Sequence, residues 1–304
     1  MLLSLPEKRA EQNPPFDFFG WATLMLGMIG LQMMLDRGER LEWFNSAEIW
    51  VEAIASVLGF YLYLVHVLTA KAHFLDKALF KDRNFVLSAT MYFAFGFVLL
   101  PTIALTSPML DEILKYPADT TGYMAIPRSI ALVGALILAA RVVPARIDNR
   151  LLVAGGMALV IYANWRMLGY SPEMDWRFVV EAGAVQGVGL GILLPTLNKT
   201  AFSTLDPRLR PEGTAFFNMS RLYGSSIGVA LVLVFFYDNT QAMHLTLAKD
   251  LVPYRAAAHV AGSIGRPGLA TLNDMITGQA AFIGVIDQFK VMMIAMLIVR
   301  ASSR

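Results

Sequence analysis

Two arginines lie inside apolar stretches of the chain, and their chemistry is the first constraint on function. Arg128 follows Pro127 near the middle of one stretch, and Arg221 lies in "NMSRLYGSSIGVALVLVFF", residues 218–236. A guanidinium stays protonated at ordinary pH, so neither side chain can carry a proton. Each could instead contact a substrate or a carboxylate along a polar path. The structural alternatives are a packing ion pair for Arg128 and, for Arg221, a charge that reaches back to the lipid headgroups.

Other polar residues within apolar stretches are further candidates for substrate binding or coupling: Glu181, Gln186, Asn218 and Tyr223. Arg177 precedes Glu181 by four residues, so the spacing predicts a salt bridge along one helix, with proton carriage by Glu181 as the alternative. Asp287 and Lys290 are three residues apart and could neutralise each other in the same way.

The sequence offers no candidate for enzyme chemistry, a metal or a cofactor. It has no Cys, its four His are scattered, and it contains no HExxH motif. The net charge of +2 is too small to argue for nucleic acid. We therefore expect a protein that is not an enzyme and needs no cofactor.

Composition places the chain in a lipid bilayer. Hydrophobic residues make up 56% of it and charged residues 16%, with a mean hydropathy of +0.54, whereas soluble domains average about 25% charged residues. A helix needs about 20 apolar residues to cross a bilayer. The sequence predicts an all-α, multi-pass bundle with about eight spans: 16–35, 49–69, 84–106, 122–140, 151–168, 178–197, 214–237 and 280–299.

Small residues within these stretches predict close packing between helices. Ser220, Gly224 and Gly228 are spaced by four and form one stripe on a helix, which lets a neighbouring backbone approach. The run "QGVGLG" from Gln186 imitates part of a dinucleotide loop, but that motif requires a preceding strand. Inside an apolar helix it indicates helix packing instead.

The distribution of Lys and Arg predicts the orientation. Alternate loops are about twice as basic as the others, which places both termini in the cytoplasm. The segment 238–279 is then expected to be a long loop on the outer side, with turn signals at Pro253 and at residues 266–268.

Several segments together resemble the 14-spanning drug:proton antiporters of the major facilitator superfamily, the EmrB/QacA type. "NMSRLYGSSIGVAL" resembles the penultimate helix of that family, "LQMMLDRGERLEWFNSAEI" the turn between its two extra central helices, and "VQGVGLGILLPTLNKTAF" its twelfth span. "PARIDNR" resembles a degenerate copy of the superfamily's gating loop, which makes Arg146, Asp148 and Arg150 gating candidates. In that family, the segment that holds Gln186 lines the central cavity.

The resemblance implies the C-terminal half of a transporter. Its parts would be a cytoplasmic segment (residues 1–15), two linker helices (16–70) and a six-helix bundle (71–304). The implied activity is alternating-access export of lipophilic drugs or other amphipathic small molecules across the inner membrane, in exchange for protons. Because six preceding spans of the family are absent, the alternative is a truncated or half-transporter chain that needs a separate N-terminal half. A periplasmic adaptor is a further candidate partner.

Overall fold

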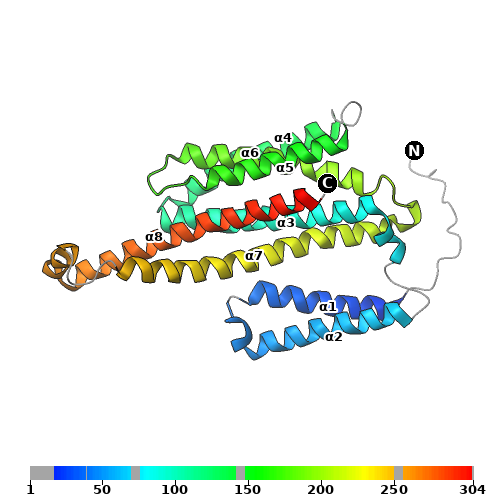
Figure 1. Cartoon of the computed structure of the whole chain (residues 1–304), viewed down its shortest axis with the longest axis horizontal. Coiled ribbons are helices and arrows are strands. Elements are labelled where there is room, and N and C mark those ends of the chain that lie inside the picture. The colour runs from blue at the N-terminus through cyan, green and yellow to red at the C-terminus, as the bar shows by residue number, and fades with distance from the viewer. Residues whose placement is uncertain (1–16, 39, 70–75, 142–147, 250–255, 303–304) are drawn as a thin grey trace. The chain divides into compact units, whose positions relative to one another are not determined.

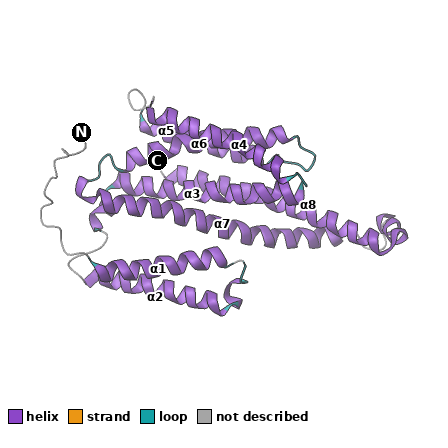
Figure 2. Cartoon of the chain, turned by 180° about the vertical axis from the view of Figure 1, so that it is seen from behind, coloured by secondary structure: helices purple, strands orange, loops and turns teal. Residues whose placement is uncertain are grey.

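The computed structural model describes residues 17–38, 40–69, 76–141, 148–249 and 256–302, and all regular structure in these residues is helical (Figure 2). The N-terminal segment predicted for residues 1–15 lies outside them. The chain divides into two compact units, Met1–Lys77 and Ala78–Arg304. The predicted all-α fold is confirmed.

The first unit is a helical hairpin of α1 (Phe18–Arg37) and α2 (Ala47–Thr69), joined through the short η1 (Trp43–Asn45). The helices touch through glycines: a Cβ added to Gly59 would lie 2.2 Å from the backbone nitrogen of Gly27. Polar side-chain contacts join the helices near both ends. His66 Nε2 lies 2.9 Å from an oxygen of Asp17, and Arg37 pairs with carboxylates of α2.

The second unit is a bundle of six long helices that run alternately up and down (Figure 1). They are α3 (Arg83–Pro108), α4 (Ala118–Arg141), α5 (Asn149–Met167), α6 (Trp176–Ala201), α7 (Arg210–Lys249) and α8 (Ala256–Ser302). α4 and α5 pack on α6, α3 packs on α7, and α8 packs on α7 and α5. Asp82, Asp148 and Asp175 begin α3, α5 and α6, because each carboxylate accepts a backbone N–H of the first turn.

Of the eight α-helices in the described residues, seven are long and apolar enough to cross a bilayer. The exception is α5, which matches the predicted span 151–168 in position but is less apolar. It begins at Asn149 and Arg150, and it carries Asn164 and Arg166 near its end. The six-helix bundle buries part of it, including Asn164, against its neighbours.

The long loop predicted for residues 238–279 is wrong for the part that the structure describes. α7 continues to Lys249 and α8 begins at Ala256, so only residues 250–255 separate them, and those lie outside the described residues. The run "TQAMHLTLAK" at the end of α7 is rich in good helix formers, which outweighed the turn signals beyond it. A helix of 40 residues is about 60 Å long, twice the hydrocarbon thickness, so α7 must project beyond the bilayer.

The predicted small-residue contacts are confirmed in α6 and α7. A Cβ on Gly224 would lie 2.0 Å from the carbonyl oxygen of Phe93, so α7 rests directly on α3. Within "QGVGLG", a Cβ on Gly187 would lie 2.3 Å from the carbonyl oxygen of Arg128 on α4. The glycines therefore pack helices together, and in α6 they fix the helix that carries Arg128.

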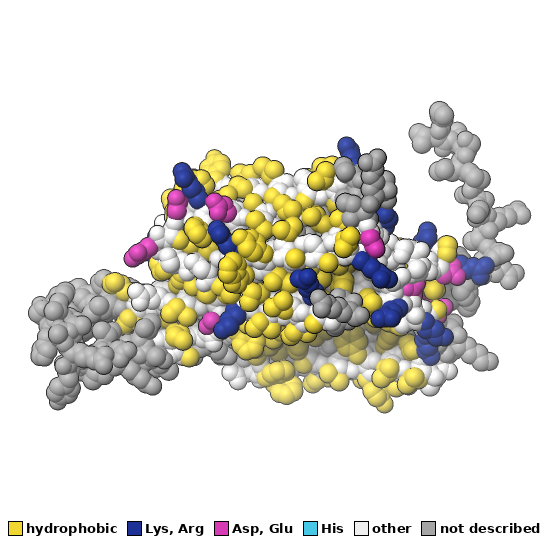
Figure 3. Space-filling model, turned by 45° about the horizontal axis from the view of Figure 1, so that its top comes forward, with side chains coloured by type: hydrophobic (Ala, Val, Ile, Leu, Met, Phe, Trp, Pro, Cys, Tyr) yellow, Lys and Arg dark blue, Asp and Glu magenta, His cyan; other side chains and the backbone are white. Residues whose placement is uncertain are grey.

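Charged side chains of the bundle gather at its two ends. One end holds the starts of α3, α5 and α7 and the ends of α4, α6 and α8, with a basic set: Arg83, Arg141, Arg150, Lys199, Arg208, Arg210 and Arg300. Figure 3 shows hydrophobic side chains over much of one face, with many Lys and Arg side chains toward one end. We call this the basic end of the bundle.

Candidate functional site

A cavity of about 280 Å³ lies among α3, α4, α6 and the turn between α5 and α6, and Arg128 is the charged residue of its lining. We call it the Arg128 cavity. Its wall is mostly apolar, with a set of hydroxyl groups: Thr102, Thr106, Ser107, Thr121, Ser129 and Tyr170. An apolar wall with a few polar groups is typical of small-molecule sites, which usually measure about 300–1,000 Å³.

Arg128 is held by its backbone rather than by an ion pair. Its carbonyl lies against Gly187, and its side chain lies along α6, 3.6 Å from the position of a Cβ on Gly183. A guanidinium N–H donates to the carbonyl oxygen of Leu99 at 3.4 Å, the long limit of a hydrogen bond. Within the described residues, no carboxylate lies at ion-pair distance. The positive charge is therefore available to a molecule in the cavity.

Tyr170 provides a second polar group in the same cavity. It is 4% exposed, its ring packs edge-on against Phe289 on α8, and its hydroxyl has no hydrogen-bond partner among the described residues. Burial raises the pKa of this phenol, while the nearby charges of Arg128 and Arg166 act in the opposite direction. The phenol stays protonated and can donate a hydrogen bond. An unsatisfied buried hydroxyl costs free energy that a ligand acceptor would recover.

Gln186 lies behind the cavity wall, not on it. Its side chain is fully buried, and its amide donates to Thr102 Oγ1 at 3.1 Å, which joins α6 to α3. The Gln186 carbonyl oxygen has no partner in the described part of the chain. Since Thr102 lines the cavity, Gln186 can position that hydroxyl.

The salt bridge predicted between Arg177 and Glu181 is wrong. Glu181 instead accepts from Arg166 at 3.2 Å, across from α5, while Arg177 lies 3.8 Å from Asp175. The end of α5 brings Arg166 beside α6, where its guanidinium also lies 4.7 Å from the ring centre of Phe178. Glu181 is exposed and paired, which leaves it poorly suited to carry a proton through the bundle.

The candidates on α7 do not converge on the Arg128 cavity. Arg221 is partly buried, with its guanidinium carbon 5.9 Å from the centre of the Tyr92 ring. Asn218 is exposed and donates to the carbonyl of Thr214 at 3.0 Å, within its own helix. Tyr223 is partly buried. None of the three lines this cavity.

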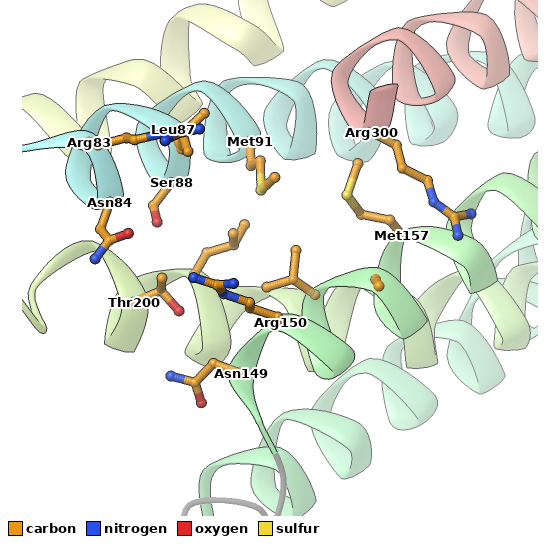
Figure 4. A pocket seen from close by; sticks show the side chains of 13 residues that line it. Arg83, Asn84, Leu87, Ser88, Met91, Asn149, Arg150, Met157, Thr200 and Arg300 are labelled. Atoms are coloured by element: carbon orange, nitrogen blue, oxygen red, sulfur yellow. The ribbon is translucent and has the colours of Figure 1, made fainter. Parts of the chain in front are cut away.

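Of the gating candidates, Arg146 lies outside the described residues. Asp148 caps α5, where its carboxylate accepts the backbone N–H of Arg150 at 3.0 Å. The side chain of Arg150 borders a second cavity, of about 550 Å³, at the basic end of the bundle (Figure 4).

Comparisons with known proteins find similarity to bacterial resistance and export proteins. The chain is 29% identical over 283 residues to the fatty acid resistance protein FarB of Neisseria gonorrhoeae, covering 90% of this chain and 55% of FarB. It is 27% identical over 255 residues to the multidrug export protein EmrB of Escherichia coli K12, covering 83% and 49%. No family model matches the chain. The chain is homologous to EmrB-type multidrug exporters.

The resemblance expected from the sequence is therefore confirmed. The fold agrees: a bacterial homologue of the human lysosomal transporter Spinster superposes with a TM-score of 0.54 at 15% identity, over 94% of this chain and 67% of the other. Seven apolar helices and bacterial homologues of the EmrB type identify a multi-pass inner-membrane protein. The chain spans about half the length of the curated relatives that it matches.

Thr102 and Tyr170 are polar residues of the Arg128 cavity that the sequence did not predict as site residues. Thr102 follows Pro101 in an apolar run, and Tyr170 lies in a turn outside every predicted span. Neither belongs to a motif quoted for the EmrB-type resemblance. Only the packing of α3, α4 and α6 brings them beside Arg128, so no local pattern could have identified them.

Asp287 does not make the ion pair with Lys290 that its spacing suggested. It lies in the middle of the apolar part of α8, residues 275–301. Among the described residues, no ion pair joins it to Lys290 or to another cation. Adjacent Gln288 is fully buried, and neither polar atom of its amide has a described partner. Asp287 is therefore a partly buried carboxylate at mid-span with no cation paired to it among the described residues.

Proposed function

We propose that the chain forms part of a secondary transporter that exports amphipathic small molecules by alternating access. The observation that carries this proposal is the Arg128 cavity, an apolar chamber with an uncompensated guanidinium and the free hydroxyl of Tyr170, in a bundle homologous to exporters. Such a wall accepts molecules with an apolar body and one hydrogen-bond acceptor or acidic group. Fatty acid resistance and multidrug export, for which FarB and EmrB are named, fit this substrate class.

The orientation is part of the proposal. The basic end of the bundle would face the cytoplasm, because basic residues are retained on that side of the inner membrane. The Arg128 cavity would then lie toward the outer half of the bundle, since it is lined by the end of α3 and the starts of α4 and α6.

We also propose that protons are exchanged for substrate, and we assign proton binding to Asp287. Arg128 and Arg221 cannot release a proton, and Glu181 is held by Arg166. Asp287 lies in the apolar part of α8, two residues before the Phe289 ring that packs on Tyr170 of the cavity. Loss or gain of its proton would change the charge within the apolar part of α8.

A second candidate function is that the chain transports its substrate only together with another six-helix bundle. Two observations favour it: the chain spans about half of its relatives, and α4 exposes a set of large apolar residues: Tyr123, Ile126, Ile130, Val133, Ile137 and Leu138. A central pathway between two bundles is the general arrangement of such transporters.

One transport experiment tests both candidates. The chain would be expressed in an exporter-deficient strain, alone and together with the first six spans of E. coli EmrB, and energised efflux of dodecanoate would be measured. We expect efflux at least in the paired form, and Arg128→Gln should lower it about tenfold or more at equal membrane abundance. The control Arg141→Gln removes a charge outside the cavity. Absence of efflux in both forms, or equal loss in the control, would contradict the proposal.

The assignment of Asp287 has its own test. Asp287→Asn should abolish substrate-induced proton uptake in inverted vesicles but retain equilibrium substrate binding within about threefold. Lys290→Gln is the matched control and should retain proton uptake. Normal proton uptake by the Asp287 variant would remove it from the mechanism.

A further inference from the structure

The second cavity has a composition unlike that of the Arg128 cavity, with which it shares no lining residue. It lies at the basic end of the bundle, among the starts of α3 and α5 and the ends of α6 and α8. Its volume of about 550 Å³ is within the range of small-molecule sites. Three arginines line it, Arg83, Arg150 and Arg300, and no carboxylate does (Figure 4).

The nearest acidic residues along the chain, Asp82 and Asp148, do not pair with Arg83 or Arg150. Asp82 caps α3 through the N–H of Phe85 and also accepts the Thr204 hydroxyl. Asp148 caps α5. No carboxylate in the described part of the chain lies within ion-pair distance of Arg83 or Arg150. Arg83 and Arg150 therefore contribute positive charge to the cavity that no described carboxylate pairs with.

Other groups at the rim add to the preference for an anion. The starts of α3 and α5 both border the cavity, so the positive ends of two helix dipoles, each capped by one aspartate, lie at its rim. Asn149, at the start of α5, is also part of the lining (Figure 4).

The interior of the cavity is apolar. Met157 and Leu197 are 3% and 1% exposed and form part of its wall, together with Leu87 and Met91 of α3. A hydrated inorganic anion would gain nothing from such a wall, whereas an alkyl chain would be removed from water. The arginines then bind the acidic head at the rim.

We propose that this cavity binds an anionic amphiphile: a carboxylate or phosphate head held by Arg83, Arg150 and Arg300, with its alkyl chain along Leu87, Met91 and Met157. The source is either a free alkyl acid or the headgroup and one chain of an anionic phospholipid. The proposal concerns binding alone, so it does not depend on transport by the chain.

The test is direct binding to the purified 304-residue chain in phosphatidylcholine nanodiscs. Dodecanoate and dodecyl phosphate should bind and displace each other, and dodecyltrimethylammonium, with the same chain and the opposite charge, should not compete. The double variant Arg83→Gln/Arg150→Gln should weaken dodecanoate binding by about tenfold or more. Arg141→Gln, at the same end of the bundle but outside the cavity, should leave binding unchanged.

A second variant guards against a folding defect. Met91→Trp fills the apolar part without changing charge and should also exclude dodecanoate, while the circular dichroism of each variant stays that of the parent. Equal competition by dodecyltrimethylammonium, or unchanged affinity in the double arginine variant, would overturn the proposal.

The source of the acid is identified by repeating the titration in phosphatidylglycerol nanodiscs. If dodecanoate no longer binds there, the anionic lipid occupies the site; if it binds in both discs, the free acid is the preferred ligand. Both results support an acid-binding cavity. Failure of dodecanoate to bind in both kinds of disc overturns it.

Discussion

The two units differ in whether their buried charges have carboxylate partners. In the α1–α2 hairpin, Arg37 pairs with Glu52 at 2.9 Å and with Glu48, and Glu52 is 8% exposed. In the six-helix bundle, Arg128 and Arg221 have no carboxylate partner among the described residues. In the hairpin the arginine has carboxylate partners. In the bundle one arginine faces a cavity and the other lies over an aromatic ring.

This difference separates structural charges from functional ones. A charge whose partner is already present contributes to holding two helices together, and its loss is paid in stability. A guanidinium beside a cavity, with one long hydrogen bond, contributes little to folding, and its loss should appear in binding. Removal of a paired charge in the hairpin should therefore lower stability, whereas removal of the guanidinium beside the cavity should lower binding and activity.

The largest effect on stability is expected for Arg37→Gln. This change leaves Glu52 buried without a cation, and one of its oxygens already lacks a hydrogen-bond partner within the described structure. We expect a loss of about 3 kcal/mol, measured by thermal unfolding in detergent. Glu48→Gln is the matched control, because Glu48 is 61% exposed, and it should cost less than about 1 kcal/mol.

The double variant Arg37→Gln/Glu52→Gln sharpens this result. Removal of both charges leaves no buried ion, so most of the lost stability should return, as a double-mutant cycle would show. A double variant as unstable as Arg37→Gln would mean that packing of the arginine stem, rather than its charge, holds the hairpin.

The opposite effect on stability, a gain, is expected for Arg128→Met. Methionine keeps the length of the side chain and removes a desolvated charge, so the bundle should become more stable by about 1 kcal/mol while efflux falls. Thermal unfolding and efflux would be measured on the same preparation. A loss of stability would show that the contact with Leu99 is structural and would remove the contrast between the units.

The sequence predicted the helices well and the site only in part. Long apolar runs and small-residue stripes depend on local composition, and both survive in the structure; Gly187 and Gly224 lie where close helix contacts require them. The partners of polar residues depend on how helices pack. Hence Glu181 pairs across to Arg166 rather than along its own helix, and Tyr170 reaches the cavity from a turn. Helix propensity near Lys249 also outweighed the turn signals that predicted a loop.

The smallest effect is expected for Arg221→Met. Its guanidinium lies over Tyr92, a ring that is 4% exposed and stacks on Phe217 with centres 4.1 Å apart, so the arginine has an aromatic partner in place of an anion. We expect a loss of about 0.5–1 kcal/mol, with efflux within about twofold of the parent. A cycle with Tyr92→Leu isolates the pair, because the coupling should vanish when the ring is absent. If Arg221→Met instead lowered efflux as strongly as Arg128→Gln at unchanged stability, the bundle would contain two functional cations, and the polar path would extend from α4 to α7.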